Sequence, residues 1–233
     1  MISRNRNYGK KEPNKDAHRI LIVCEGNDTE PKYFGFFKEL SPRLDVIPIP
    51  SEDGKADPVK LKEWAELNVI KAPIIEFDYF QGDTIWFVID TDEWEEQGKI
   101  GVLRQFCQEQ NNALKEAIKN KHYERKPYNA WLVAQSNPCF EIWEYYHIYN
   151  EIPITEEVEK HASFKEFVDA VIKGGFDPDI MPVEVVKAIA NAKSYFSKDD
   201  EGRLQLYATE VFLLAEEMLP FVERDINRLR NIL

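Results

Sequence analysis

Residues 20–26 read ILIVCEG, an unbroken apolar run that ends in a carboxylate and a glycine. A continuous apolar run of this kind is typical of a parallel β-strand that is buried on both faces. A second run, residues 85–89 (IWFVI), is followed directly by DTD at residues 90–92. Ligands of open α/β sheets bind at the carboxyl ends of the strands, so we expect both acidic clusters at one edge of one sheet.

Glu25, Asp90 and Asp92 are the carboxylates that this edge would bring together. Residues i and i+2 of an extended segment point the same way, so Asp90 and Asp92 can bind one cation or two neighbouring ones. Carboxylates so placed repel one another unless a hard cation such as Mg²⁺, or Mn²⁺, lies between them. The sequence therefore predicts metal-dependent phosphate chemistry. The plainer alternatives are a helix-capping aspartate, a loop acid and an exposed glutamate at a strand end.

Strand and helix patterns alternate as far as residue 134. Apolar runs predict strands at 18–24, 44–49, 85–89 and 128–134, and apolar residues at helical spacing predict helices at 30–40, 57–72 and 100–121. This order is typical of a layered α/β protein with a parallel sheet. Right-handed crossovers then place helices on both faces of the sheet.

After residue 134 the pattern becomes helical. Helices are expected at 140–149, 164–172, 182–196 and 206–229, and Pro220 should kink or split the last of them. The chain thus divides into three expected regions. These are a flexible basic tail at 1–17, an α/β domain at 18–150 and a helical C-terminal extension at 151–233 that packs on the sheet or on a partner.

The formal net charge is −12, although the N-terminal tail is mostly basic. A protein this acidic lacks the broad basic face with which many proteins bind nucleic acid. Selective binding of nucleic acid stays open, because metal ligands account for part of the acidity and the tail can contact phosphate. A plain soluble tail explains the same residues.

The three cysteines, Cys24, Cys107 and Cys139, fit neither a disulfide framework nor a zinc site. We expect reduced thiols of an intracellular protein, with Cys24 a small residue of the core. No apolar run reaches the length of a transmembrane helix, and the N-terminus has no secretory h-region. The expected location is the cytoplasm, without membrane contact.

Residues 136–141 (SNPCFE) form a third polar cluster, directly after the fourth predicted strand. The start of the next helix presents free backbone N–H groups that favour phosphate, so Ser136 and Asn137 are candidate substrate-binding residues. Glu141 lies one turn into that helix and is a further candidate metal ligand. Capping of the helix is an equally good role for Asn137.

The remaining titratable residues carry weaker signals. Glu30 is a candidate substrate-binding residue, and Lys193 is a candidate for stabilising phosphate charge in the transition state. Lys187 and Lys198 are alternatives, although a solvated helix face explains each lysine as well. His147 is expected to be a helix-surface or a packed histidine. No nucleophile elbow, P-loop or GxGxxG motif is present, so serine-hydrolase, NTPase and dinucleotide-binding functions find no support.

Four segments resemble motifs of RloB-like proteins. They are residues 21–34 (LIVCEGNDTEPKYF), 90–92 (DTD), 136–143 (SNPCFEIW) and 207–211 (YATEV). The first and third of these motifs are the more specific, and together the four span most of the chain. RloB-like proteins are similar to Toprim-domain proteins, so the resemblance implies a Toprim-like fold with a compact parallel sheet.

The resemblance also implies a site and a biological setting. Glu25 would act as acid or base, and Asp90 and Asp92 would bind magnesium. The family is associated with bacterial restriction and abortive-infection loci, often beside an ABC- or AAA-type ATPase. Related Toprim effectors cleave tRNA when such an ATPase releases them. The implied role is a toxic nuclease effector of antiphage defence.

OLD-type nucleases are Toprim proteins that also use a serine and a glutamate after a later strand, and a distal lysine. Ser136 and Glu141 match the first two, and Lys193 is the candidate for the third. The resemblance therefore implies that these three residues complete the site.

The leading hypothesis is a Mg²⁺-dependent endonuclease that acts on RNA, including tRNA, or on DNA. A second is a non-catalytic adaptor that binds the ATPase through the apolar stripe between Tyr207 and Leu229. A third is a nucleotidyl- or phosphoryl-transfer enzyme with a small substrate. A homo-oligomer is compatible with each.

Overall fold

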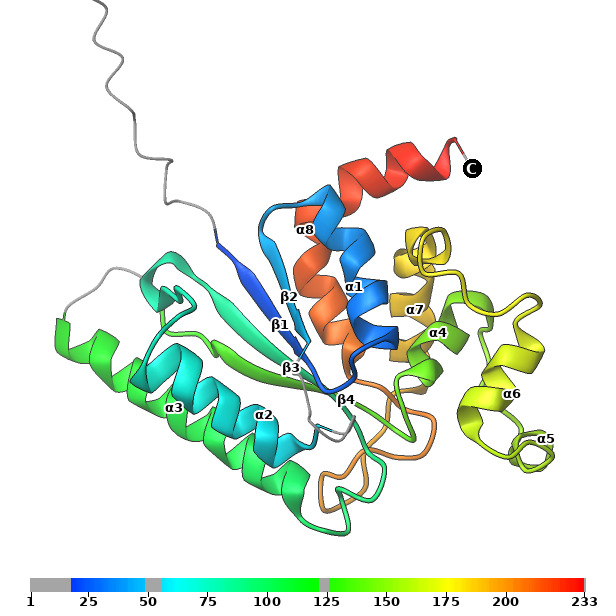
Figure 1. Ribbon diagram of the computed structural model, residues 1–233, viewed down its shortest axis with the longest axis horizontal. Helices are drawn as coiled ribbons and strands as arrows, with labels where there is room; N and C mark the ends of the chain where they lie inside the picture. Colours follow the sequence, from blue (N-terminus) through cyan, green and yellow to red (C-terminus); the bar gives the residue numbers. More distant parts are fainter. Residues whose placement is uncertain (1–17, 49–55, 122–125, 233) are drawn as a thin grey trace, which may run out of the picture.

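A computed structural model describes residues 18–48, 56–121 and 126–232. The tail expected at 1–17 lies outside the described residues. Four strands form one parallel sheet in the order β2-β1-β3-β4 (Figure 1). Their bounds are β1 (Ile20–Cys24), β2 (Leu44–Pro48), β3 (Thr84–Asp90) and β4 (Trp131–Ser136). The predicted α/β fold with a parallel sheet is confirmed, and it is consistent with a Toprim-like fold.

Helices connect and follow the strands. They are α1 (Thr29–Leu40), α2 (Pro58–Ala65), α3 (Lys99–Lys121), α4 (Glu141–Ile148), α5 (Thr155–Val158), α6 (Phe164–Val171), α7 (Val185–Tyr195) and α8 (Val211–Arg230). Short turns of other helix types are η1 (Glu66–Lys71), η2 (Tyr79–Gln81) and η3 (Met181–Glu184). Within the described ranges, no helix is both long and apolar enough to cross a membrane.

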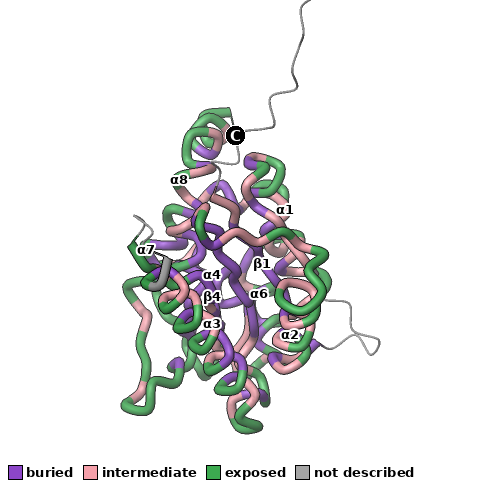
Figure 2. The backbone as a smooth tube through the Cα atoms, turned by 90° about the vertical axis from the view of Figure 1, so that its left-hand side faces the viewer, coloured by how far each residue is buried: buried purple, intermediate pink, exposed green. Residues whose placement is uncertain are grey.

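The sheet is covered on both faces, which explains the unbroken apolar runs in its strands. Alternate residues of β1 enter different cores. Ile20 and Ile22 pack with α1 and α8 on one face, whereas Leu21 and Val23 pack with α2 and α3 on the other (Figure 1). The buried backbone accordingly runs through the middle of the molecule, and the exposed backbone follows the outer helices (Figure 2).

The C-terminal region shares a core with the sheet. Glu217 of α8 accepts hydrogen bonds from Trp86 Nε1 (2.9 Å) and from the hydroxyl of Thr84, both in β3. Met218 and Val222 of α8 are buried in the same core as β1. Helix α8 therefore packs on the sheet, and one hydrophobic core contains residues from both sides of position 150.

The start of α8 and the end of β4 differ from the sequence-based expectation. Helix α8 begins at Val211 instead of 206 and continues past Pro220 without being split. Strand β4 continues to Ser136 instead of ending at 134. Tyr207 has a φ of 65°, and its N–H donates to Asn137 O at 2.8 Å. The residues before α8 therefore pair with the end of β4, and this tertiary pairing overrides the helical spacing.

Candidate functional site

The carboxyl edge of the sheet brings the two predicted acidic clusters together. In the parallel register, Cys24 of β1 lies beside Val88 of β3, and Asp90 lies beside Ser136 of β4. The pairing continues one residue beyond β1, because Glu25 N–H donates to Val88 O at 3.0 Å. Glu25 is thereby held next to the end of β3, where Asp90 lies.

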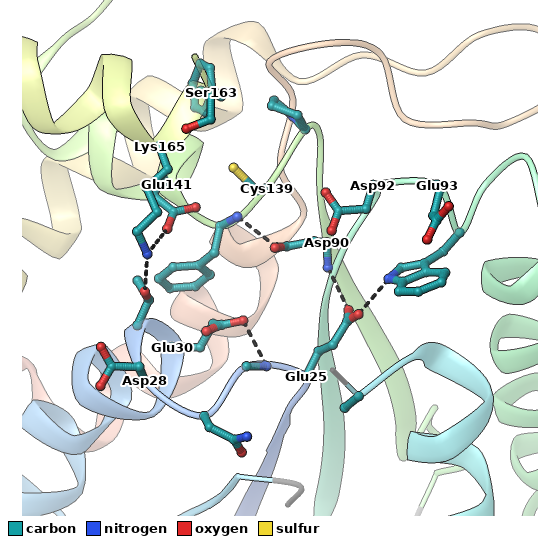
Figure 3. A pocket seen from close by; sticks show the side chains of 18 residues that line it. Glu25, Asp28, Glu30, Asp90, Asp92, Glu93, Cys139, Glu141, Ser163 and Lys165 are labelled. Atoms are coloured by element: carbon teal, nitrogen blue, oxygen red, sulfur yellow. Dashed lines mark hydrogen bonds and ion pairs between the residues drawn. The ribbon is translucent and has the colours of Figure 1, made fainter. Parts of the chain in front are cut away.

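A cavity of about 540 Å³ opens at this edge (Figure 3). Its walls come from the β1–α1 turn, the segment after β3, the β4–α4 loop and the start of α6. The predicted carboxylates all line it: Glu25, Glu30, Asp90, Asp92 and Glu141. Three separate parts of the chain therefore contribute carboxylates to one acidic space.

Glu25 is held by two donors from the β3 side of the cavity. Its Oε2 accepts the Asp90 N–H at 3.1 Å, and its Oε1 accepts Trp94 Nε1–H at 2.6 Å. Burial raises the pKa of Glu25 from 4.5 to about 8; the two hydrogen bonds oppose this shift, and the charges of Glu30 and Asp92 add to it. Glu25 therefore holds a proton near neutral pH.

Asp90 lies in the middle of the carboxylates (Figure 3). Its Oδ1 accepts the Phe140 N–H from the β4–α4 loop at 2.8 Å. Burial raises the pKa of Asp90 well above its ordinary value, and the charges of Glu30, Glu25 and Glu141 raise it further. Ionised carboxylates that lie this close repel one another, so ionisation of all of them at once is unfavourable.

Gly26 lets Glu30 fold back over the β1–α1 turn. Glu30 Oε1 accepts the Gly26 N–H at 3.2 Å. A Cβ at position 26 would lie 2.8 Å from both Cδ and Oε1 of Glu30, so a larger residue would displace the carboxylate. Burial raises the pKa of Glu30, and the charge of Glu141 contributes in the same direction. The group that approaches Gly26 closely is thus a neighbouring side chain.

Lys165 of α6 contributes a positive charge to the cavity wall. Its Nζ lies 3.0 Å from Glu141 Oε1 and donates to Thr29 Oγ1 at 3.2 Å. Partial burial lowers the pKa of Lys165, but the hydrogen bond and charge of Glu141 outweigh it, and the net shift is upward. The Lys165 side chain is 57% exposed, whereas Glu141 is buried. Lys165 therefore stays charged and accessible.

The donor set fits a hard divalent cation in its chemistry. Carboxylate oxygens are the ligands that Mg²⁺ and Mn²⁺ prefer, and a bound cation would relieve the repulsion among them. As placed, Glu25 and Asp90 accept hydrogen bonds from backbone N–H groups instead. Across the described part of the chain, no three His, Cys, Asp or Glu side chains are close enough to hold one ion. Coordination of one ion therefore requires these carboxylate side chains to move closer together.

Ser136 and Asn137, the predicted substrate-binding residues, do not line the cavity. Ser136 is fully buried, and its Oγ lies 2.8 Å from Thr209 Oγ1. Asn137 Nδ2 donates to Leu204 O at 2.8 Å, and its side chain does not cap α4. Both residues bind the segment before α8 because that segment pairs with the end of β4. The structure therefore places both side chains away from the cavity in which substrate contact was expected.

Lys193 is also placed away from the cavity. It is exposed on α7, and its Nζ lies 2.5 Å from Glu216 Oε1 of α8. Because α7 packs against α4 and α8, Lys193 pairs with α8 and not with the sheet edge. The alternatives Lys187 and Lys198 likewise bind partners outside the cavity. Among the described residues, the lysine that lines the cavity is Lys165, and Lys193 lies outside it.

Lys165 and Trp94 are the site residues that sequence reasoning missed. A signal for the start of α6 was present, because Ser163 is an N-cap residue whose Oγ accepts the Glu166 N–H at 3.1 Å. That signal locates the helix start but not the direction in which it points. Trp94 follows the second acidic cluster, and no spacing rule connects it with Glu25.

His147 is a packed residue, which is one of the two roles expected from the sequence. It is fully buried, with Nδ1 2.9 Å from Trp143 O and Nε2 3.1 Å from Tyr33 Oη. Burial lowers the pKa of His147 to about 3, so the ring is neutral. The packed role is confirmed, and His147 is not one of the acid–base groups of the cavity.

Comparison with protein families gave a match to the family described as "RloB-like protein", over residues 20–218. The matched region contains every cavity residue from Glu25 to Lys165. Neither the comparison with curated proteins nor the comparison with solved structures found a match.

Proposed function

The chain belongs to the RloB-like family, and on that premise we propose that it is a Mg²⁺-dependent endonuclease of RNA, including tRNA, or of DNA. One observation carries the proposal. The ends of β1, β3 and β4 deliver carboxylates to a single cavity, where burial and crowding raise the pKa values of Glu25, Glu30 and Asp90. Shifts of this kind favour a functional site, and oxygen ligands favour a hard cation.

Asp90, Asp92 and Glu141 are the proposed ligands of Mg²⁺ or Mn²⁺, with Glu25 as a further ligand or as an acid–base group. When bound, the ion supplies Lewis-acid stabilisation of the phosphate charge. Binding, orientation of the substrate and proton transfer then depend on the protein's own groups.

Glu25 is the proposed proton donor. Burial raises the pKa of Glu25 to about 8, which favours the protonated carboxyl near neutral pH. The Asp90 N–H and the Trp94 indole fix both of its oxygens, so the group is held in one orientation. A carboxyl so held can give its proton to the leaving oxygen of a phosphodiester.

Lys165 takes the role first expected of Lys193. Its ammonium is anchored by Glu141 and Thr29 at the cavity wall and remains more than half exposed. A fixed positive charge beside a phosphate stabilises the negative charge that develops in the transition state. Lys165 also gives an acidic cavity a local contact for a polyanionic substrate.

The proposed setting is antiphage defence, in which an ABC- or AAA-type ATPase partner restrains a toxic cytoplasmic effector. Family membership supports this setting. The net charge of −12 supports selective over general binding of nucleic acid. The apolar stripe between Tyr207 and Leu229 favoured a non-catalytic adaptor. Leu214, Met218 and Val222 of this stripe are buried in the chain's own core.

The substitution Asp90→Asn tests the nuclease proposal. It removes a carboxylate but keeps an oxygen that accepts the Phe140 N–H, so the fold should be retained. We expect metal-dependent cleavage of tRNA, other RNA or DNA to fall by at least about a hundredfold. The assay compares Mg²⁺, Mn²⁺ and EDTA with each substrate, using the full chain.

Asp179→Asn is the matched control, because it makes the same change of charge at an exposed residue outside the cavity. It should cleave like the wild type. Cleavage that persists in Asp90→Asn, or in EDTA, would sink the proposal. An ATPase that co-purifies with a wild-type chain unable to cleave any nucleic acid would support the adaptor instead.

A further inference from the structure

Residues 204–210, between α7 and α8, lie along the outer side of the end of β4. Backbone hydrogen bonds join the two: Glu210 N–H donates to Gln135 O (2.7 Å), Asn137 N–H to Ala208 O (2.9 Å) and Tyr207 N–H to Asn137 O (2.8 Å). This part of the chain includes the YATE of the C-terminal motif, which does not line the acidic cavity. The motif therefore needs a role other than contact with substrate.

Two side chains strengthen this pairing from within the protein. Thr209 and Ser136 are both fully buried, and their hydroxyl oxygens lie 2.8 Å apart. The buried carboxylate of Glu210 accepts the Gln135 N–H at 3.2 Å. Arg104 of α3 and Lys198 bind the same carboxylate at 2.5 and 2.7 Å. The 204–210 segment is thus tied to the sheet, to α3 and to the segment that follows α7.

The inner side of the same stretch of β4 holds the acidic site. Thr91 N–H donates to Ser136 O (2.9 Å) and to Pro138 O (3.1 Å), and Thr91 Oγ1–H donates to Ser136 O (2.8 Å). Phe140 N–H then donates to Asp90 Oδ1. Residues 136–140 therefore have the 204–210 segment on one side and the acidic end of β3 on the other.

We propose that Thr209 and Glu210 are positioning residues of the acidic site. They hold Ser136 and the loop after it, and that loop in turn sets the place of Asp90 and of the turn that follows it. The positioning is a property of the fold, and only its effect on metal binding rests on the proposed nuclease function. The proposal also gives Ser136 a role without contact with substrate.

The hydroxyl pair is the most sensitive point of this arrangement. Replacing Thr209 by valine keeps the shape of the side chain but leaves the buried Ser136 hydroxyl without its partner. Leaving a buried polar group without its partner costs more free energy than one hydrogen bond contributes on balance, because the group does not regain its contact with water. Serine at position 209 restores the hydroxyl, so it should restore the site.

Amide hydrogen exchange tests the proposal directly in the full chain. The protection factors of the Thr91 and Phe140 amides are measured relative to that of Ile22, in the middle of β1. In Thr209→Val we expect this ratio to fall by about tenfold, and in Thr209→Ser to stay within about twofold of the wild type.

Asn111→Ala is the matched control. Asn111 binds the outer side of the same strand at its other end, where it accepts from the Ala130 and Trp131 N–H groups and donates to Trp131 O. It should lower the overall stability and leave the ratio unchanged. An unchanged ratio in Thr209→Val, or an equal fall in Asn111→Ala, would overturn the positioning role.

Calorimetric titration with Mn²⁺ separates this inference from the proposed function. If both hold, Thr209→Val should bind Mn²⁺ about tenfold more weakly than the wild type, and Asn111→Ala should bind like the wild type. A wild-type chain that binds no Mn²⁺ contradicts the proposed metal site. The exchange ratios then still decide the positioning role on their own.

Discussion

The two edges of the sheet use carboxylates in opposite ways. At the amino-terminal edge, the buried Asp83 accepts the backbone N–H groups of Arg19 and Asp78, each at 2.9 Å. The guanidinium of Arg19 is paired with Asp45 on the neighbouring strand. At the carboxyl-terminal edge, Asp90 lies among carboxylates whose charges, together with burial, raise its pKa.

The difference indicates which edge stabilises the fold and which is the better candidate for a binding site. A buried carboxylate with enough donors stabilises the native state, because the charged form is satisfied. Carboxylates that crowd one another oppose their own ionisation and make the native state less stable than it need be. Such local conflicts are expected at functional sites, so the comparison by itself favours the carboxyl-terminal edge as the site.

The largest expected effect is on the free energy of unfolding, which should respond differently to substitutions at the two edges. Asp83→Ala leaves two backbone N–H groups without their acceptor, so the free energy of unfolding should fall by about 2–4 kcal/mol. Asp90→Asn removes repulsion and keeps its acceptor oxygen, so it should unfold at the same or a higher urea concentration. Urea unfolding of both variants at neutral pH measures the contrast. A loss in Asp90→Asn as large as that in Asp83→Ala would remove the distinction between the edges.

The next effect in size is on kcat, and it compares a lysine at the carboxyl-terminal edge with a lysine away from it. Lys165→Ala removes the ammonium beside Glu141, and we expect kcat to fall by about ten- to a hundredfold. Lys193→Ala removes an exposed lysine that is paired with Glu216, so kcat should stay within about twofold of the wild type. Single-turnover cleavage assays compare the two. Equal losses would mean that the position of the lysine, and hence the assignment of the cavity, is wrong.

The smallest expected effect tests whether crowding continues behind the cavity. Burial raises the pKa of Glu144 from 4.5 to about 8, and the charge of Glu141 adds to the shift. Between these two values the unfolded chain has lost the proton and the folded chain still holds it, so stability falls as the pH rises. Glu144→Gln should remove the share of this fall that Glu144 contributes, about 1 kcal/mol per pH unit. Glu25, whose pKa is also raised to about 8, contributes a share that stays in both proteins.

Urea unfolding of the wild type and Glu144→Gln at several values between about pH 5 and about pH 8 measures this difference. The gap between the two proteins should widen steadily as the pH rises. A constant gap would show that Glu144 ionises normally and that the repulsion is confined to the cavity itself.

Much of the sheet, and the carboxylates at its carboxyl edge, could be predicted because the rules involved are local. The apolar runs at 20–24 and 85–89 identify strands buried on both faces, and parallel strands bring their carboxyl ends to one edge. Glu25 and Asp90 followed from that rule alone. Lys165 did not, because it meets Thr29 across 136 residues of sequence, and no local pattern encodes such a contact.

The third motif, residues 136–143, also shows what local sequence patterns cannot predict. The sequence placed polar residues after β4 but could not say to which side of the strand each would point. Asp90 turns toward the cavity, whereas Ser136, its neighbour in the register, turns toward Thr209. The helical spacing from 206 onward was misleading for the same reason, since residues 204–210 exchange backbone hydrogen bonds with β4.

By itself, the sequence determined that this chain forms a parallel α/β sheet and that carboxylates gather at one of its edges. Both outcomes depend on the period of side chains along strands and on the handedness of short connections, which act over a few residues. Only the tertiary structure decided which polar groups surround those carboxylates. That choice depends on how α6 and the 204–210 segment pack against the sheet, and packing is settled by contacts between residues far apart in the chain.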